Sequence, residues 1–193
     1  YDHSGNSNHG TIYGASWSTN VPITQTYVPD DNFEQALIDL GYDDVLDDYV
    51  ATDNINEVEV LYVDNREISD LTGIEGFTSL TTLICDNNEL TSLDFSNNVA
   101  IETIVCANNE LTSLDVFNNT ALTTLSCYNN QLTSLDVSAN TALTSLYGGN
   151  NDLTALDVSS NTALENLQCY NNQLTSLDVS NNTDLTTLHC NNN

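Results

Sequence analysis

The feature that most constrains this chain is a period of 21 residues. Its five cysteines lie 21 or 42 residues apart, and the one position that this spacing skips holds Gly148. The cysteines are Cys85, Cys106, Cys127, Cys169 and Cys190. Self-similarity at a fixed period of this length predicts a stack of small, similar units that bury a continuous core between them.

The repeating unit reads L-x-x-L-x-C-x-N-N-x-L-T-x-L-D-V-S-x-N-T-x. Apolar residues alternate at its start, as a strand with one buried face requires. Leu125 and Cys127 are expected to point inward, whereas Thr124, Ser126 and Tyr128 point outward. One strand cannot bury its face alone, so we expect a parallel sheet of stacked strands. A thiol is small and apolar, and we expect all five cysteines to be buried and reduced.

Seven rungs are expected, the last one partial. A unit of 22 residues from Val58 precedes units that begin at Leu80, Ile101, Leu122, Leu143, Leu164 and Leu185. The asparagines of one register are expected to bond the turns of their own and the adjacent coil: Asn88, Asn109, Asn130, Asn151, Asn172 and Asn193.

Two further series repeat with the same period. One is the aspartate of LDVS, and the other is a later asparagine. Both are expected to form side-chain-to-backbone turns on the convex side. The positions are Asp94, Asp115, Asp136, Asp157 and Asp178, and Asn98, Asn119, Asn140, Asn161 and Asn182.

This pattern resembles the 21-residue leucine-rich repeat over about residues 28–193. It is similar to the repeats of the cysteine-ladder internalins and of cell-surface leucine-rich-repeat proteins of Bacteroidetes. The resemblance implies an α/β repeat fold, a right-handed solenoid of horseshoe shape. Its parallel sheet would lie on the concave side, irregular turns on the convex side, and a helical cap at the N-terminal end.

Three segments are expected along the chain. Residues 1–27 read as a leader or linker, and SGNSNHGTIYGASW within them resembles a strand of lectin-like modules. Residues 28–57 read as the N-terminal helical cap, and residues 58–193 as the repeats.

The cap is expected to hold a helix that starts after Asp30 or Asp31 and ends at Gly41. A second short helical turn is expected around Val45 and Leu46. Such a cap would cover the exposed edge of the first coil.

The charge of the chain excludes several partners. One basic residue, Arg66, faces 28 acidic residues, for a net charge of −27. Phosphates of nucleic acids and anionic lipid head groups should repel such a chain. The sequence has no run of 18 apolar residues, so we expect no membrane insertion by this chain. Because it starts at Tyr1, it reads as processed or as part of a longer multi-domain polypeptide, with an extracellular or cell-surface location.

No catalytic or cofactor chemistry is indicated. The cysteine spacing lacks a convergent metal-ligand set, and alternation sends His189 and Cys190 to opposite faces. We therefore expect no enzyme and no cofactor, with calcium as the one ion to consider. The calcium candidates are Asp43, Asp44, Asp47 and Asp48. The competing interpretation is a solvated acidic cap.

The candidate ligand site is the outward face of the strands, because its residues vary while the framework repeats. Tyrosine offers flat area and a hydroxyl group to a protein or neutral glycan ligand. Gly148 and Gly149 are expected to leave room beside Tyr147. The candidates are Tyr128, Tyr147, Tyr170, Gln168, Asn166, His189 and Ser126. Strand propensity and packing between rungs would explain the same residues without a ligand.

Three functions are consistent with these patterns. The first is non-enzymatic binding or adhesion by a secreted or cell-surface protein, with its ligand on the concave face. The second is a structural stalk, spacer or appendage subunit whose repeats set its length. The third is surface glycan binding linked to polysaccharide use.

Overall fold

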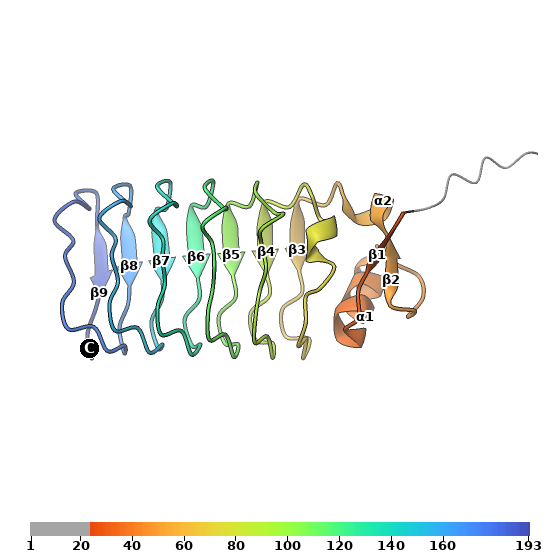
Figure 1. Cartoon of the computed structure of the whole chain (residues 1–193), viewed down its shortest axis with the longest axis horizontal. Helices are drawn as coiled ribbons and strands as arrows, with labels where there is room; N and C mark the ends of the chain where they lie inside the picture. The colour runs from red at the N-terminus through yellow and green to blue at the C-terminus, as the bar shows by residue number, and fades with distance from the viewer. Residues whose placement is uncertain (1–23) are drawn as a thin grey trace, which may run out of the picture.

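The structure is a computed structural model that describes residues 24–193. It is a stack of coils with a small helical cap at one end (Figure 1). Seven short parallel strands form one sheet in chain order. They are β3 (Val60–Tyr62), β4 (Thr82–Ile84), β5 (Thr103–Val105), β6 (Thr124–Ser126), β7 (Ser145–Tyr147), β8 (Asn166–Gln168) and β9 (Thr187–His189). The expected solenoid with a parallel sheet is confirmed.

Register follows the repeat, since each strand residue pairs with its equivalent in the next coil. Leu125 lies opposite Ile104 on one side and Leu146 on the other. These side chains point inward and are fully buried. Burial of one such side chain contributes roughly 2 kcal/mol, so the column of them is the main source of stability.

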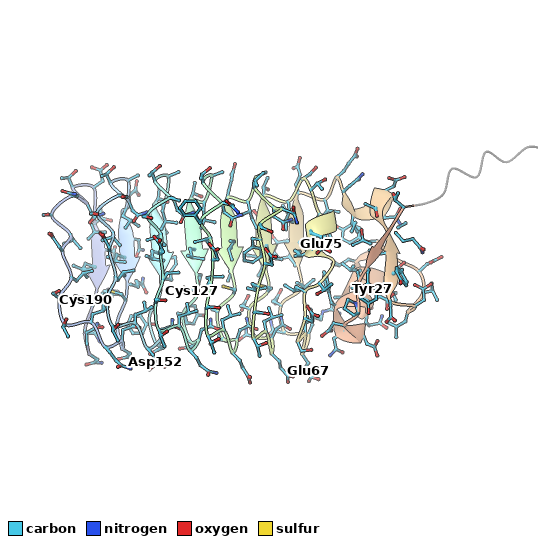
Figure 2. All side chains as sticks on the ribbon, in the orientation of Figure 1. Tyr27, Glu67, Glu75, Cys127, Asp152 and Cys190 are labelled. Carbon is cyan, nitrogen blue, oxygen red and sulfur yellow. The ribbon has the colours of Figure 1, made fainter. Side chains whose placement is uncertain are left out.

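The cysteine ladder forms inside this core, with one exception. Cys85, Cys106, Cys127 and Cys169 are buried, whereas Cys190 on the last coil is exposed, and all five are free thiols. Figure 2 shows Cys127 in the middle of the stack and Cys190 at its end. The expectation that all five are buried is wrong for Cys190, because among the described residues only one coil adjoins its strand.

Burial also sets the acidity of these thiols. It raises the pKa of Cys127 to about 12 and that of Cys169 to about 11. The pKa values of Cys85 and Cys106 are raised further by the same loss of solvation. The buried thiols are therefore protonated at neutral pH and poor nucleophiles.

Asn130 shows how the first asparagine series works. Its Nδ2 donates to the carbonyl oxygens of Cys106 at 3.0 Å and Cys127 at 3.1 Å. Its Oδ1 accepts the N–H of Leu111 at 2.9 Å. The amide thus joins its own coil to the preceding one, as expected, and the equivalent asparagines bond in the same way.

The second asparagine series corrects a prediction. Asn140 is fully buried, and its Nδ2 donates to the carbonyls of Val116 at 2.9 Å and Asn119 at 2.8 Å. It is an internal ladder between coils rather than a local surface turn, because the preceding turn leaves two carbonyls facing the core. Only the aspartates make local turns; Asp136 Oδ1 accepts the N–H of Ser138 at 2.9 Å.

The cap consists of two short helices and a pair of antiparallel strands. Helix α1 spans Asp31–Leu40, and α2 spans Thr52–Ile55. Strand β1 (Gln25–Tyr27) pairs with β2 (Tyr49–Ala51). A 3-10 turn, η1 (Ile74–Gly76), lies in the first coil. Among the described residues, none of the helices has the length and apolar character needed to cross a bilayer.

Helix α1 has the predicted ends. The side chain of Asp30 accepts the N–H groups of Asn32 and Phe33, and Gly41 ends the helix with a φ of 81°. The second helical turn expected around Val45 and Leu46 is wrong, because both residues are exposed in an irregular turn. The reason is the carboxylate of Glu34, which accepts N–H groups from Asp47 and Tyr49 and directs the chain into β2.

The cap closes the apolar end of the first coil. The rings of Phe33 and Phe77 lie 6.4 Å apart, and both are fully buried. Gly73 permits the close approach of β1, since a Cβ there would lie 2.8 Å from the carbonyl oxygen of Tyr27. Strand β1 falls within the segment expected as a leader, and the lectin-like stretch lies outside the described residues.

Candidate functional site

The outward side chains of the sheet, with the residue after each cysteine position, form one surface that we call the strand face. Tyr147 of β7 lies in register between Ser126 of β6 and Gln168 of β8. Tyr128 and Tyr170 follow the cysteine positions of the two flanking coils. The structure thus brings the three tyrosines onto three adjacent coils, and all three are half-buried.

A polar network connects two of these strands. Asn166 Nδ2 lies 3.5 Å from the hydroxyl oxygen of Tyr147, a long hydrogen bond across neighbouring strands. Gln168 Nε2 donates to Asn166 Oδ1 at 3.3 Å. These contacts orient three candidate side chains relative to one another without any ligand.

The glycine pair does not leave the room that the sequence predicts. A Cβ on Gly149 would come within 2.8 Å of the Tyr170 ring, so that ring already fills the space above Gly149. Gly148 takes the cysteine position and points into the core, where a Cβ would have only Leu153 near it, at 4.0 Å. The missing side chain of Gly149 is therefore used to seat Tyr170.

Two other candidates stand apart from this group. Ser126 is only 7 % exposed, because it lies in register between the larger Val105 and Tyr147. His189 is exposed and pairs in register with Gln168, at the far end of the sheet. The strand face therefore centres on Tyr147, Asn166 and Tyr170.

The sequence reasoning missed a ladder of exposed amides beside this face. Each member has a φ near 55° and donates from Nδ2 to the Oδ1 of the asparagine one coil earlier, at 2.5 to 2.8 Å. The members are Asn108, Asn129, Asn150, Asn171 and Asn192. The available signal was the first asparagine of each N-N pair, since asparagine tolerates the left-handed region.

The end of the strand face near the cap is acidic. Asp64 and Asp86 occupy equivalent positions on adjacent coils. Partial burial and the charge of Asp64 raise the pKa of Asp86. Two neighbouring carboxylates without a basic partner favour a cation or a basic side chain on a ligand.

The larger surface hollows lie over turns and not over the strand face. One of about 390 Å³ is lined by residues that include Asp70, Glu75 and Asp94, and another of about 440 Å³ includes Asp115 and Phe117. The strand face is accordingly a surface for an extended partner rather than for an enclosed small molecule.

The calcium candidates divide in the structure. Of Asp43, Asp44, Asp47 and Asp48, only Asp48 joins a group with ligand geometry, and its companions are Asp31 and Glu34. Partial burial and the charges of Glu34, Asp44 and Asp47 raise the pKa of Asp43. Asp31 and Glu34 could not be selected from sequence, because both also suit the first turn of a helix.

The stacked sheet, the buried cysteines and the asparagine ladders define a leucine-rich-repeat domain. No family model matches the sequence. Over 72 residues the chain is 42 % identical to internalin J of Listeria monocytogenes serotype 4b (strain F2365), a match that covers 37 % of this chain and 8 % of internalin J. The chain is thus an internalin-like leucine-rich-repeat protein with a cysteine ladder.

Solved structures agree with this assignment. The functional domain of InlJ from Listeria monocytogenes, described as including a cysteine ladder, is 32 % identical with a TM-score of 0.60. That match covers 87 % of this chain and 48 % of the InlJ domain. The internalin InlF of the same species has a TM-score of 0.79 at 24 % identity, covering 86 % of this chain and 51 % of that one, which shows the shared fold.

The chain spans about half the length of these solved domains and a small part of internalin J. Leucine-rich-repeat domains of the internalin class are non-enzymatic, in agreement with the expectation that this chain is not an enzyme. The resemblance to proteins of Bacteroidetes stays a prediction.

Proposed function

We propose that this chain is a protein-binding domain of a longer, exported cell-surface protein, and that its ligand lies across β6, β7 and β8 of the strand face. The resemblance to surface repeat proteins supports the location and the role. The partial coverage of internalin J supports a longer polypeptide. Within it, residues 1–27 would serve as a leader or linker, 28–57 as the cap and 58–193 as the repeats.

The observation that carries the proposal is the ordered group around Tyr147. Asn166 and Gln168 are joined to it by hydrogen bonds, and Tyr170 is seated on Gly149. A surface whose aromatic and amide groups are fixed before binding loses less side-chain entropy when a partner arrives. Aromatic side chains of this kind are the usual anchors of protein interfaces.

Charge narrows the chemistry of the partner. The net charge is −27, and Asp64 and Asp86 extend the same face toward the cap. A partner with a neutral or basic surface is attracted, whereas nucleic acids and anionic membranes are repelled. A neutral glycan meets the same charge condition, and a spacer role would need no partner at all.

The test compares variants of the strand face with a matched surface variant. Tyr147→Ala, Asn166→Ala and Tyr170→Ala each remove one member of the ordered group. Phe117→Ala is the control, since Phe117 is an aromatic residue 59 % exposed on a turn away from the strands. Binding is measured against a displayed library of extracellular protein domains and, separately, a glycan array.

Selective loss of protein binding in the strand-face variants, with Phe117→Ala unchanged, supports the proposal. Selective loss of glycan binding would transfer the same face to the glycan-binding role. Equal binding by all four variants would place the ligand elsewhere. An absence of binding in both screens would leave the spacer role as the better account. Circular dichroism of each variant verifies that the fold is intact.

A further inference from the structure

The cap contains a group of three carboxylates that is separate from the strand face. One oxygen each of Asp31, Glu34 and Asp48 lies within 4.8 Å of the other two. Asp31 and Glu34 belong to the first turn of α1, and Asp48 lies in the loop just before β2. We propose that these residues bind a calcium ion that joins the start of α1 to this loop.

Glu34 supplies the second, independent observation. Its side chain is fully buried, and Oε1 accepts the N–H groups of Asp47 at 2.9 Å and Tyr49 at 3.1 Å. Its other oxygen, Oε2, is buried without any hydrogen-bond partner. A buried carboxylate oxygen with no donor costs several kcal/mol of folding free energy unless a cation or a proton compensates it.

No side chain of the chain can provide that cation. The sequence contains one Lys or Arg residue, Arg66, and it pairs with Asp39 at the other end of α1. The N-terminal dipole of α1 favours Asp31 and Glu34 as ordinary first-turn acids. It gives no donor to Glu34 Oε2, however, and it does not account for Asp48, which belongs to a different segment.

The geometry selects the kind of ion. Carboxylate oxygens are hard ligands, which suit calcium and magnesium. Calcium binds oxygen at roughly 2.3–2.6 Å, so two of its ligands can be up to about 5 Å apart, whereas a magnesium shell allows about 4.2 Å. A mutual separation within 4.8 Å therefore fits calcium better. Asp31 and Asp48 are exposed, which leaves solvent access for water ligands.

A third acidic side chain borders the group. Asp43 also has a buried oxygen, Oδ2, without a hydrogen-bond partner. Its charge and that of Glu34 act on each other. A bound divalent cation would offset the repulsion among all four carboxylates, which explains why a folded cap brings them together.

The test uses the 193-residue protein after treatment with EDTA. Calorimetric titration with calcium chloride, and separately with magnesium chloride, gives the affinities. Thermal unfolding is then followed at increasing calcium concentration. We expect Tm to rise by roughly 5 °C or more when free calcium exceeds Kd by about a hundredfold. Magnesium should bind more weakly.

Three variants make the result specific. Glu34→Gln should abolish the calcium shift of Tm while folding at least as well as the parent in EDTA, because it removes the buried charge. Asp48→Asn should weaken calcium binding at least tenfold, and asparagine keeps the φ of 68° at that position without strain. Asp53→Asn removes one charge from the same cap outside the group and should leave binding unchanged.

Two results would overturn the site. One is an absence of both heat and Tm shift with calcium in the parent protein. The other is an equal calcium response in the parent, Glu34→Gln and Asp48→Asn, which would indicate diffuse screening of the acidic surface. Neither result bears on the strand face, which these variants do not touch.

Discussion

Asp30 and Ser69, 39 residues apart in the chain, are joined by two hydrogen bonds. The N–H of Ser69 donates to Asp30 Oδ2 at 2.9 Å, and its hydroxyl donates to the same oxygen at 2.7 Å. The other carboxylate oxygen, Oδ1, caps α1 through Asn32 and Phe33. One side chain therefore starts the cap helix and fastens it to the first coil.

Replacement of Asp30 by alanine should loosen the cap. We expect Asp30→Ala to lower the free energy of unfolding by about 2–3 kcal/mol, because a helix N-cap and charged hydrogen bonds are lost together. Urea unfolding followed by circular dichroism measures the change. Asp53→Ala, an exposed acid of the same cap, is the control and should change stability by less than about 0.5 kcal/mol. Equal effects of the two substitutions would contradict the assigned role.

The same residue predicts a pH dependence. Partial burial acts to raise the pKa of Asp30, but hydrogen bonds from Ser69, Phe33 and Asp70 outweigh it and hold the pKa below its usual range. A carboxyl whose pKa is lower in the folded state stabilises the fold above its unfolded pKa of about 3.9 and loses that contribution as pH falls. The stability difference between the parent and Asp30→Asn should be constant near neutral pH and shrink below about pH 4. A difference that grows on acidification would refute this assignment.

Completion of the cysteine ladder should stabilise the protein. Gly148 has no left-handed φ, and a Cβ there has only Leu153 Cδ1 near it, at 4.0 Å. Gly148→Cys should raise the free energy of unfolding by about 1 kcal/mol, through added apolar burial and a less flexible unfolded chain. Gly148→Ser has a similar shape but buries a hydroxyl without a partner, so it should be less stable than the cysteine variant by about 1–3 kcal/mol. Chemical denaturation of both variants decides the matter.

The contact between Gly149 and Tyr170 should appear as an energetic coupling. Gly149→Ala places a methyl group where the Tyr170 ring lies, so the ring must swing outward. We expect a cost of about 1 kcal/mol that largely disappears in a Tyr170→Ala background. A double-mutant cycle with urea unfolding measures this. Additive effects of the two substitutions would mean that the ring does not rest on Gly149.

The thiols should fall into two classes. In the native protein at pH 8 we expect one thiol to react quickly with Ellman's reagent and four to react only after denaturation. The exposed Cys190 should be the fast one, and burial with raised pKa values protects the others. In Cys190→Ser the fast phase should vanish. Rapid reaction of all five thiols in the parent protein would be incompatible with a buried ladder.

The repeats were predictable because a period of two inside a period of 21 leaves one arrangement of strands. Leu125 and Cys127 must face inward together, and every coil then stacks in the same register. Helix α1 was predictable from Asp30 and Gly41, whose side chain and backbone preferences mark its ends locally. In these segments local preference and tertiary packing agree.

The segment before β2 was not predictable, since its path depends on Glu34, which binds the N–H groups of residues 13 and 15 positions later. Asn130 and Asn140 are the same residue type, yet sequence alone did not show that both amides lie between coils. For the strand face, alternation predicted which side chains point outward. It could not predict that Tyr170 turns onto Gly149, which is a choice of side-chain rotamer.

The bonds of Asn130 have a consequence for inheritance. They reach back 19 and 24 residues, and those of Asn140 reach back 24 and 21, so each partner lies in the adjoining unit. Unequal recombination that duplicates or deletes one whole unit would supply every asparagine with an equivalent partner. Loss of a single codon would misalign all of them at that junction. Such a gene can change the reach of its product in whole steps, and selection needs to repair nothing afterwards.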